Sequence, residues 1–364
     1  MLLSEILQHL EEKAPFALQE NYDNSGLIIG LADQEIHSAL VCLDITEDII
    51  MEAIDRKCNL VISHHPMIFS GMKRITGRNA TERLVATALK ENIAIVAMHT
   101  NLDNHPDGVN SLLCGKLGIL NTRILRPMEG QLRKLVTFSP KSHSNTVQSA
   151  IFSAGAGQIG NYDSCSFSVS GNGSFRALPG SHPFVGKQDE LHIEEEDRIE
   201  VIYPVYYEKR IISALLTAHP YEEVAYDIYP LSNRFPGAGA GMIGELASPM
   251  DPSEYLAIVK DTLLSGCIRH TALPVKKISK IAVCGGSGSF LIGDALAAGA
   301  DLYITGDIKY HDFFIPENRM ILADVGHYES EQFTKELIFT LLKKKFPTFA
   351  LLNSETPTNP VNYL

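Results

Sequence analysis

The sequence lacks the features that mark membrane and secreted proteins. It has no run of about 18 apolar residues, the length that a membrane-spanning helix needs. Segment 1–15 has the apolar spacing of an amphipathic helix. It lacks the basic start, apolar run and small-residue cleavage site of a signal peptide. We therefore expect neither a membrane span nor a secretory leader.

Paired cysteines are also missing. The six cysteines are scattered and form no CxxC pair, which excludes the usual zinc-finger pattern. A chain of 364 residues can bury a sizeable core and does not need disulfides to fold. These two points favour a reducing compartment, and we expect a cytoplasmic protein.

Positive charge is in deficit. The formal net charge is −12, and no basic run stands out. A strongly acidic protein has no generic attraction to nucleic acid or to an anionic membrane. We therefore expect neither of these as a partner.

What the sequence does contain is a regular alternation of strands and helices near its start. Short apolar runs at 39–44, 59–66 and 94–104 are separated by helical patterns at 47–57 and 81–93. This order predicts an α/β fold with a mostly parallel sheet that helices cover on both faces.

The end of the chain repeats this order. Strands are expected at 280–286, 301–307 and 319–327, and helices at 289–300 and 329–346. The two segments therefore have the same predicted architecture.

A gapless superposition of the two segments places Leu60 and Ile62 on Leu302 and Ile304. This indicates a weak internal repeat, although two strand–helix–strand units also match by chance. If the repeat is genuine, both ends of the chain build one pseudo-symmetric fold, and their strand ends can face a shared cleft.

The middle of the chain has the order β-α-β-β-α-β, which is typical of a ferredoxin-like domain. The expected elements lie at 132–138, 144–157, 162–171, 198–205, 208–219 and 224–231, with a Gly/Ser/Pro-rich loop over 172–188. The Gly-rich stretch 235–246 then returns to the first fold. We predict that 130–233 is a domain inserted into a discontinuous α/β domain of 1–129 and 234–364.

Two adjacent histidines stand at the end of an apolar strand. His64 and His65 close the 59–66 run, and Pro66 bends the exit. In open α/β sheets, ligands bind beyond the carboxyl ends of the strands. Both imidazoles can therefore reach one cleft. The alternative is two surface histidines in a loop.

Asp103 is expected at the same edge of the sheet, because the 94–104 strand runs into the loop HTNLDN. A carboxylate there can ligate or bridge cations. Aspartate also favours turns, which is the alternative interpretation. His99 still lies within the predicted strand and is a candidate for orienting a ligand.

His327 and Glu331 form the sharpest local pattern. A predicted strand ends, Gly326 turns the chain, and a helix is expected to begin near Tyr328. Residues i and i+4 share one helix face, so imidazole and carboxylate can hold the same ion. Alternatively, Glu331 is an ordinary first-turn acid that complements the helix dipole.

Together these motifs supply three imidazoles and two carboxylates, all placed at strand ends. Such mixed ligation suits zinc, our first choice, or iron, manganese or cobalt, and it needs no cysteine. Five ligands exceed the three that are usual for one catalytic zinc. We therefore predict two divalent ions bridged by a carboxylate, with positions open for water.

Other polar motifs give weaker signals. Asp307 and His311 follow another predicted strand and join His99 as candidate proton shuttles. The Gly-rich turn 284–289 can cradle a phosphate or form a plain tight turn. Segment 219–223 (HPYEE) is either a hydrogen-bonded turn or a second ligand site.

The motifs SHHP, HTNLDN and DVGHYESE, in this order, resemble those of the Nif-three-like family, whose members are often called GTP cyclohydrolase I type 2 homologues. Segment 22–27 (YDNSGL) is similar to that family's WDNxGL motif, with Tyr22 in place of tryptophan. The middle segment resembles the PII/CutA-like insert of longer bacterial members, through its stretches at 154–162 and 219–223.

This resemblance implies a three-layer α/β fold, a dinuclear metal centre and a toroidal homohexamer. The ligands that it implies are His64, His65, Asp103, His327 and Glu331. It favours a metal-dependent hydrolase, similar to GTP cyclohydrolase, that acts on a nucleotide or a related small molecule. The alternative is a non-catalytic metal-binding scaffold or chaperone whose insert senses a small ligand.

Overall fold

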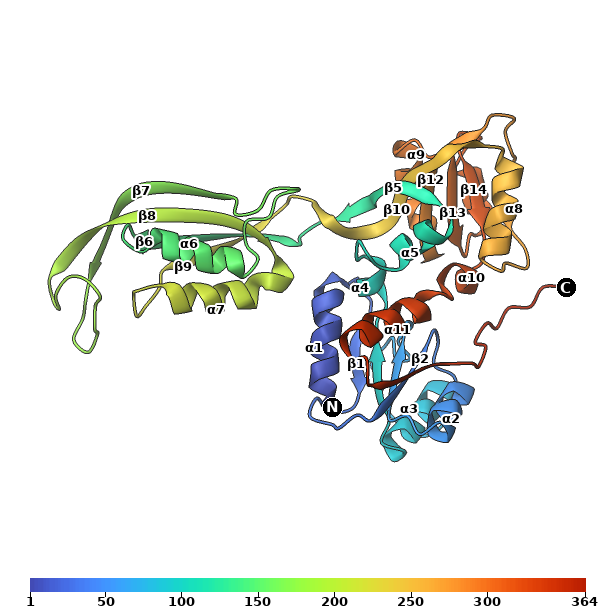
Figure 1. Ribbon diagram of the computed structural model, residues 1–364, viewed down its shortest axis with the longest axis horizontal. Coiled ribbons are helices and arrows are strands. Elements are labelled where there is room, and N and C mark those ends of the chain that lie inside the picture. The colour runs from blue at the N-terminus through green and yellow to red at the C-terminus, as the bar shows by residue number, and fades with distance from the viewer. The chain divides into compact units, whose positions relative to one another are not determined.

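The computed structural model describes all 364 residues, which divide into two compact units. Met1–Pro127 and Pro236–Leu364 form one unit, called here the discontinuous unit. Met128–Phe235 form the other, called here the insert. No helix in either unit has both the length and the apolar character needed to cross a bilayer. Figure 1 shows the chain coloured from its N-terminus to its C-terminus.

The first sheet of the discontinuous unit has the strand order β1-β4-β3-β2-β15. Four of its strands are parallel, and β1 is antiparallel to β4. The strands are β1 (Gly26–Ile29), β2 (Ser38–Cys42), β3 (Leu60–Ser63), β4 (Ala94–Ala97) and β15 (Ala350–Asn353). Every residue of β2, β3 and β4 is buried, as a sheet covered on both faces requires.

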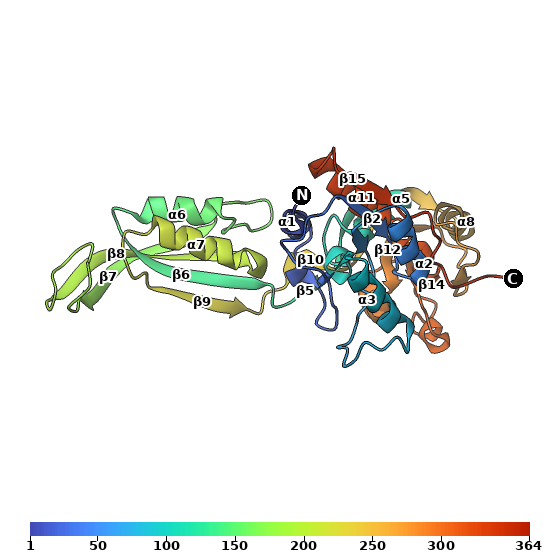
Figure 2. The ribbon, with the colours of Figure 1, turned by 90° about the horizontal axis from the view of Figure 1, so that it is seen from below.

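Alternate strand residues of this sheet face two separate cores. Val41 and Ile62 pack with residues of α1 (Leu3–Lys13) and α11 (Thr334–Lys345). Their neighbours Leu40 and Val61 pack with α2 (Glu47–Asp55) and α3 (Ala80–Lys90). Because successive side chains of a strand point to opposite faces, the apolar runs build a three-layer arrangement. Figures 1 and 2 show these helix pairs on opposite sides of the sheet.

The second sheet has the order β11-β14-β13-β12-β10-β5. Its central strands β12, β13 and β14 are parallel, and β10 is antiparallel to β12. The strands are β5 (Ile119–Met128), β10 (Phe235–Met250), β11 (Arg269–His270), β12 (Ile278–Ser287), β13 (Leu302–Gly306) and β14 (Ile321–Asp324). Helices α5 (Val109–Lys116) and α8 (Pro252–Thr262) pack on one face and α9 (Ile292–Ala297) on the other.

Each of the two sheets has three parallel strands at its centre. Leu60 and Leu302, matched in the sequence superposition, are the first residues of β3 and β13. Both leucines are buried, and both begin the middle strand of the three, since β3 lies between β2 and β4 and β13 lies between β12 and β14. The fold is therefore α/β, built from two halves of similar architecture.

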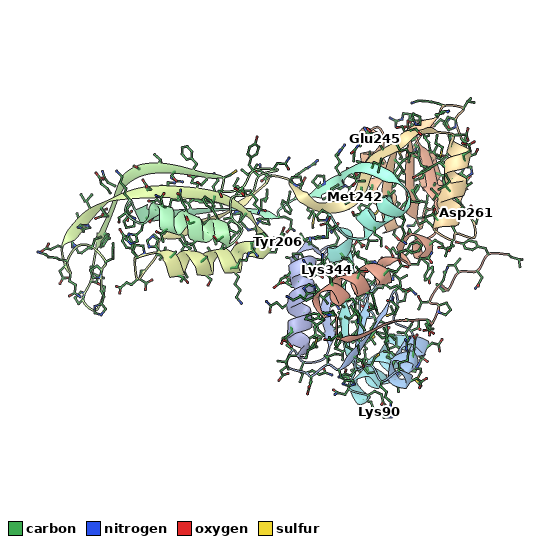
Figure 3. The ribbon with its side chains drawn as sticks, viewed as in Figure 1. Lys90, Tyr206, Met242, Glu245, Asp261 and Lys344 are labelled. Atoms are coloured by element: carbon green, nitrogen blue, oxygen red, sulfur yellow. The ribbon has the colours of Figure 1, made fainter.

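Two neighbouring strands of the second sheet, β5 and β10, carry no clear apolar pattern. β10 covers the stretch 235–246, which looks like a loop because it is rich in glycine. A Cβ at Gly244 would collide with the carbonyl oxygen of Leu120 on β5, so these glycines let two strands approach closely. Figure 3 labels Met242 and Glu245 on β10, of which the first is buried and the second exposed.

The helix predicted over 329–346 is interrupted. α10 (His327–Glu331) ends before Gln332, and α11 begins at Thr334. Two hydrogen bonds hold Gln332: its backbone N–H donates to Tyr328 O, and its side-chain Nε2 donates to Leu263 O. The short helix α10 is therefore separate from α11. Figure 3 labels the exposed Lys344 near the end of α11.

The insert is a four-stranded antiparallel sheet with two helices on one face. The strand order is β7-β8-β6-β9, as the ferredoxin-like pattern predicts. The elements are β6 (Leu132–Pro140), α6 (Ser144–Ser153), β7 (Ser166–Arg176), β8 (Leu191–Pro204), α7 (Glu208–Ala218) and β9 (Tyr226–Leu231). Figures 1 and 2 show α6 and α7 side by side along the sheet.

The β7–β8 hairpin is longer than predicted. The expected loop over 172–188 begins as strand, because β7 continues to Arg176, and β8 starts at Leu191 rather than at 198. Gly171 to Arg176 pair in register with Glu196 to Leu191. Most side chains of this part are exposed, so no apolar alternation reveals it in the sequence.

Candidate metal centre

His64 and His65 leave the end of β3 together. Both backbone amides donate to the carbonyl oxygen of Leu43, at 3.1 and 3.0 Å, so the chain no longer follows strand geometry here. Adjacent side chains can then turn toward the same region, as the sequence predicts. His64 is fully buried.

Asp103 does not lie in a loop as predicted but ends a one-turn helix, α4 (Thr100–Asp103). His99 precedes this helix, beyond β4, rather than lying within the strand. The turn is anchored by two buried amides, because Asn101 Nδ2 donates to Ala14 O and Asn110 Nδ2 donates to Asp103 O. This anchoring fixes the direction of the Asp103 carboxylate.

His327 and Glu331 are the first and last residues of α10. Gly326 precedes the helix with φ +96°, a value that only glycine adopts easily. His327 Nε2 lies 3.1 Å from Glu331 Oε2, so the two side chains share a face, as their spacing predicts.

The Gly-rich turn at the end of β12, residues 284–289, makes room for Glu331. A Cβ at Gly286 would collide with Glu331 Oε1. The backbone amides of the turn are already used: those of Gly285, Gly286 and Gly288 donate to Asn110, Ser330 and Thr305. Because these donors are occupied, the turn supports the carboxylate and is not arranged to cradle a phosphate.

The five predicted ligands converge through Glu331. Its Oε2 lies 3.0 Å from His65 Nε2 and 3.1 Å from His327 Nε2, and these two nitrogens are 3.3 Å apart. Two atoms that ligate one ion at about 2.1 Å are themselves separated by about 3.0–3.4 Å. These three atoms therefore have the spacing of metal ligands.

A second group meets on the other oxygen of Glu331. His64 Nε2 lies 3.7 Å from Glu331 Oε1 and 3.6 Å from Asp103 Oδ1. His64 Nε2 and Asp103 Oδ1 are buried atoms without any hydrogen-bond partner. Unpaired polar atoms are costly in a protein interior, so two that face each other fit a shared cation.

Each of the three imidazoles is held by a hydrogen bond through its Nδ1 atom. Nδ1 of His64 donates to the carbonyl oxygen of Met98, at 2.7 Å. Nδ1 of His65 and His327 donate to carboxylates, also at 2.7 Å. In the neutral form that binds a metal, an imidazole has one donor and one acceptor, so these contacts leave Nε2 as the atom that can bind the ion.

Two aspartates that support the centre were not identified from the sequence. Asp44 accepts the hydrogen bond from His65, and Asp23 accepts one from His99 at 2.7 Å. Asp44 follows β2 at the same sheet edge as the histidines, and Asp23 belongs to the YDNSGL motif. The position of Asp44 at a strand end and that of Asp23 within this motif could have indicated these two residues from the sequence.

The electrostatics of the metal-free centre favour protons where a cation would sit. Burial opposes the charged form of both His65 and His327. Hydrogen bonds to Asp44 and Glu331 outweigh it at His65 and raise its pKa to about 10. Hydrogen bonds to Glu331 and Asp307 raise the pKa of His327 to about 9.

The remaining groups complete this picture. Burial lowers the pKa of His64. Burial and the neighbouring Glu331 carboxylate hold the pKa of Asp103 well above its ordinary range. Burial acts in the same direction on Glu331, but the hydrogen bond with His327 and the neighbouring imidazoles of His64 and His65 outweigh it and keep the pKa of this carboxyl well below its ordinary value.

The three predicted proton shuttles have different surroundings. His99 is close enough to His64 and His65 to form a third potential ligand group with them. Asp307 accepts from His327 Nδ1 and from Ser287, so it orients the imidazole of a potential ligand. His311 is exposed beside Tyr310 and Phe314 and contacts no predicted ligand.

A cavity of about 830 Å³ opens onto this centre. His65 and His327 line it, whereas His64 and Asp103 do not. The volume lies in the range of about 300–1,000 Å³ that is typical of small-molecule sites. The cavity also includes Tyr363, which belongs to the C-terminal tail. A small molecule can therefore reach one side of the centre.

Comparisons with known proteins agree with this architecture. The profile of the Duf34/NIF3 (NGG1p interacting factor 3) family matches residues 1–360. A Bacillus subtilis protein described as a GTP cyclohydrolase 1 type 2 homolog is 39% identical, with 99% of this chain and 98% of that protein covered. A protein of the same description from Halalkalibacterium halodurans is 36% identical, over 99% of this chain and 98% of that one.

Solved structures give the same result. A Bacillus cereus protein related to NIF3 has a TM-score of 0.85 and 35% identity, and the match covers 100% of this chain and 99% of that one. A Staphylococcus aureus protein has a TM-score of 0.78 and 28% identity over the same shares. With the fold, the clustered histidines and carboxylates, and the full-length match in view, the chain belongs to the Duf34/NIF3 family.

Proposed function

We propose that the protein is a metal-dependent hydrolase that acts on a nucleotide or a related small molecule. One observation carries this proposal: five potential ligands, with donor atoms close to one another, converge beside a cavity large enough for such a molecule. The names of the similar proteins, GTP cyclohydrolase 1 type 2 homologs, support the substrate class.

The proposed centre holds two divalent ions that share Glu331. His65, His327 and Glu331 form one group of potential ligands, and His64, Asp103 and Glu331 form the other. The two oxygens of Glu331 face different groups, as a bridging carboxylate requires. Zinc is the first candidate, because mixed imidazole and carboxylate ligation suits it, with iron, manganese and cobalt as alternatives.

Bound divalent ions supply Lewis acidity and water activation. The residues of the chain do the positioning. Asp44 and Asp307 fix the tautomers of His65 and His327. The walls of the cavity hold the substrate against the open side of the centre.

Metal content tests the centre itself. The full-length protein is reconstituted with zinc, iron, manganese or cobalt, dialysed and analysed for bound metal. Anomalous scattering from crystals of the loaded protein then locates the ions. We expect two ions per chain on either side of Glu331. A single ion per chain in fully loaded protein would contradict the shared carboxylate.

Activity is tested separately with the loaded protein and a panel of nucleotides and phosphoesters that includes GTP. We expect turnover that Glu331→Ala abolishes while thermal unfolding still shows a folded protein. Glu336→Gln, on the exposed side of α11, is the matched control and keeps activity. Full metal loading without turnover of any compound would favour a metal-binding scaffold instead.

The proposal includes self-association as a homohexamer, which the resemblance of the sequence motifs supports. Light scattering coupled to size-exclusion chromatography measures the mass of the full-length protein directly. A mass of a single chain at all concentrations would contradict this part and leave the metal centre unaffected.

A further inference from the structure

The insert contains a cavity of its own, of about 750 Å³. All of its lining residues belong to the insert, so it is independent of the metal centre. The lining comes from β6, from β7 and the hairpin loop after it, from β8 and from the turn between α7 and β9. The volume again falls within the range of about 300–1,000 Å³ for small-molecule sites.

The cavity lies on the sheet face that the helices leave free. Ile199 and Val201 of β8 pack into the core with α6 and α7. Glu196 and Arg198 alternate with Ile199 along the strand, so they point to the opposite face. Both line the cavity.

Two glycines hollow this face. The β7 residues that share it are Phe167, Val169, Gly171, Gly173 and Phe175, which stand opposite the even-numbered residues of β8. On this face, the large side chains of Val169 and Phe175 therefore flank two positions, Gly171 and Gly173, that have no side chain. A Cβ at Gly171 would meet no atom within 4 Å, and one at Gly173 would collide with the Glu196 carboxylate. The missing side chains create space for Glu196 and for a ligand above it.

Glu196 is the buried charge of the cavity. It is only 9% exposed, and the hydroxyl of Tyr221 donates to its Oε1 at 2.8 Å. A carboxylate can accept about four hydrogen bonds, and a buried one needs compensation. One bond from tyrosine leaves most of this capacity for a ligand that carries N–H donors.

The other charges of the lining lie at the exposed rim. Arg198 is bound to Glu200, which lies outside the cavity, at 2.9 Å. Glu222 accepts from the backbone amide of His182, and Arg176 and Glu223 are exposed. The deep part of the cavity is therefore negative, whatever the sum of charges at its mouth.

Aromatic rings form the walls around this carboxylate. The rings of Phe175 and Phe184 lie with their centroids 6.1 and 6.2 Å from that of Tyr221. Phe138 and Val169 add further apolar surface. Apolar walls and aromatic faces attract both flat apolar bodies and cationic groups.

We propose that this cavity binds a small organic cation, an aromatic or apolar body that carries an amidinium or ammonium group paired with Glu196. The turn that contains HPYEE then has two roles. His219 fixes the turn, because its Nε2 bonds to the carbonyl oxygen of Phe138 at 2.9 Å, and Tyr221 positions the acceptor.

Three probes of similar size and different charge test the proposal on the full-length protein. Benzamidine carries an aromatic amidinium, benzamide is its neutral counterpart, and benzoate is the anion. Binding is followed by isothermal titration and by saturation-transfer NMR. We expect saturable binding of benzamidine, at least about tenfold weaker binding of benzamide and none of benzoate.

Two variants address the two halves of the argument. Glu196→Gln removes the charge and should weaken benzamidine binding at least about tenfold. Gly171→Val places a side chain in the hollow, where its Cβ would meet no atom within 4 Å, so it should abolish binding and keep the fold. Glu195→Gln is the matched control, because it removes an exposed charge next in sequence, paired with Lys141, and should leave affinity unchanged.

Three results would overturn the proposal. They are no saturable benzamidine binding up to ~10 mM, benzoate binding as tightly as benzamidine, or unchanged affinity in Gly171→Val. Thermal unfolding of each variant checks its fold. If Glu196→Gln fails to fold, Gly171→Val and the charge series of probes still decide the outcome.

Discussion

The two halves of the discontinuous unit have the same order in their central parallel strands, β4-β3-β2 and β14-β13-β12, but place different chemistry at the ends of these strands. The end of β3 supplies His64 and His65 as potential ligands. The corresponding end of β13 supplies Asp307, which orients His327 through its Nδ1. One half therefore offers donor atoms where the other offers a supporting group.

The third parallel strand of each half shows a closer match. β4 is followed by α4, with His99 and Asp103 four residues apart, and β14 is followed by α10, with His327 and Glu331 four residues apart. In both pairs the histidine Nδ1 donates to an aspartate at 2.7 Å. The repeated scaffold thus produces the same local pattern twice.

The acidic residues of these pairs differ by one methylene, and this difference decides which carboxylate reaches imidazoles of both ligand groups. Glu331 reaches His65 and His327 with one oxygen and faces His64 with the other. Asp103 comes near only His64 among the imidazoles. A symmetric scaffold therefore yields an asymmetric centre because one side chain is longer.

Shortening the bridge should have the largest effect. Glu331→Asp keeps the charge but withdraws the carboxylate from the imidazoles. We expect metal affinity to fall by more than about 100-fold, beyond the effect of changing a supporting residue. Competition with a chromophoric chelator measures this change. Affinity within tenfold of the original would show that reach is not what distinguishes the two halves.

Removing the matched histidines should have unequal effects. His327→Ala removes a potential ligand whose nitrogen lies 3.1 Å from Glu331, and we expect at least about tenfold weaker metal binding. His99→Ala removes a residue that belongs only to the group without a carboxylate, so its effect should be smaller. Titration of both variants in parallel is the measurement. A larger loss for His99→Ala would reverse the assignment of the two pairs.

The layout of the fold could be predicted because buried parallel strands give continuous apolar runs. Runs such as 59–66 and 94–104 needed no tertiary information. β10 was missed, since its glycines serve a close approach of β5 that sequence periodicity does not reveal. The long hairpin of the insert was missed for a related reason: both of its faces are largely exposed.

The candidate site was predicted less evenly. Motifs at strand ends identified five side chains that the structure brings together. Asp44 and Asp23 escaped because a supporting carboxylate has no required spacing from the histidine that it holds, and these two are distant in sequence from their partners. The role of glycine beside Glu331 also depends on a contact across the fold.

Replacing the supporting aspartates Asp44 and Asp307 should lower metal affinity by similar, intermediate amounts in the two halves. Asp307→Asn keeps the size of the side chain but weakens its hold on His327, and Asp44→Asn does the same at His65. Loss of such a partner typically costs about 10- to 100-fold in metal affinity. Metal titration compares them, with Glu336→Gln as the control. No loss in either variant would contradict their orienting role.

The smallest predicted effect is a pH dependence of stabilisation by metal. In the metal-free protein, the pKa values of His65 and His327 are raised to about 10 and about 9 from an ordinary 6.5. Raised pKa values contribute stability that is fully present below about pH 6.5 and is lost as the pH rises through about 9 to 10. The metal-free protein should therefore lose stability over that range.

Metal binding needs both imidazoles deprotonated, so protons compete with the ion less as the pH rises. The increase in Tm on adding metal should therefore grow from about pH 6.5 to about pH 9, and scanning fluorimetry with and without the ion measures it. Glu331→Asp, which separates the carboxylate from both imidazoles, should flatten this trend. An increase in Tm that shrinks with rising pH would show that protons do not occupy the place of the cation, and that His65 and His327 are not matched partners of one ion.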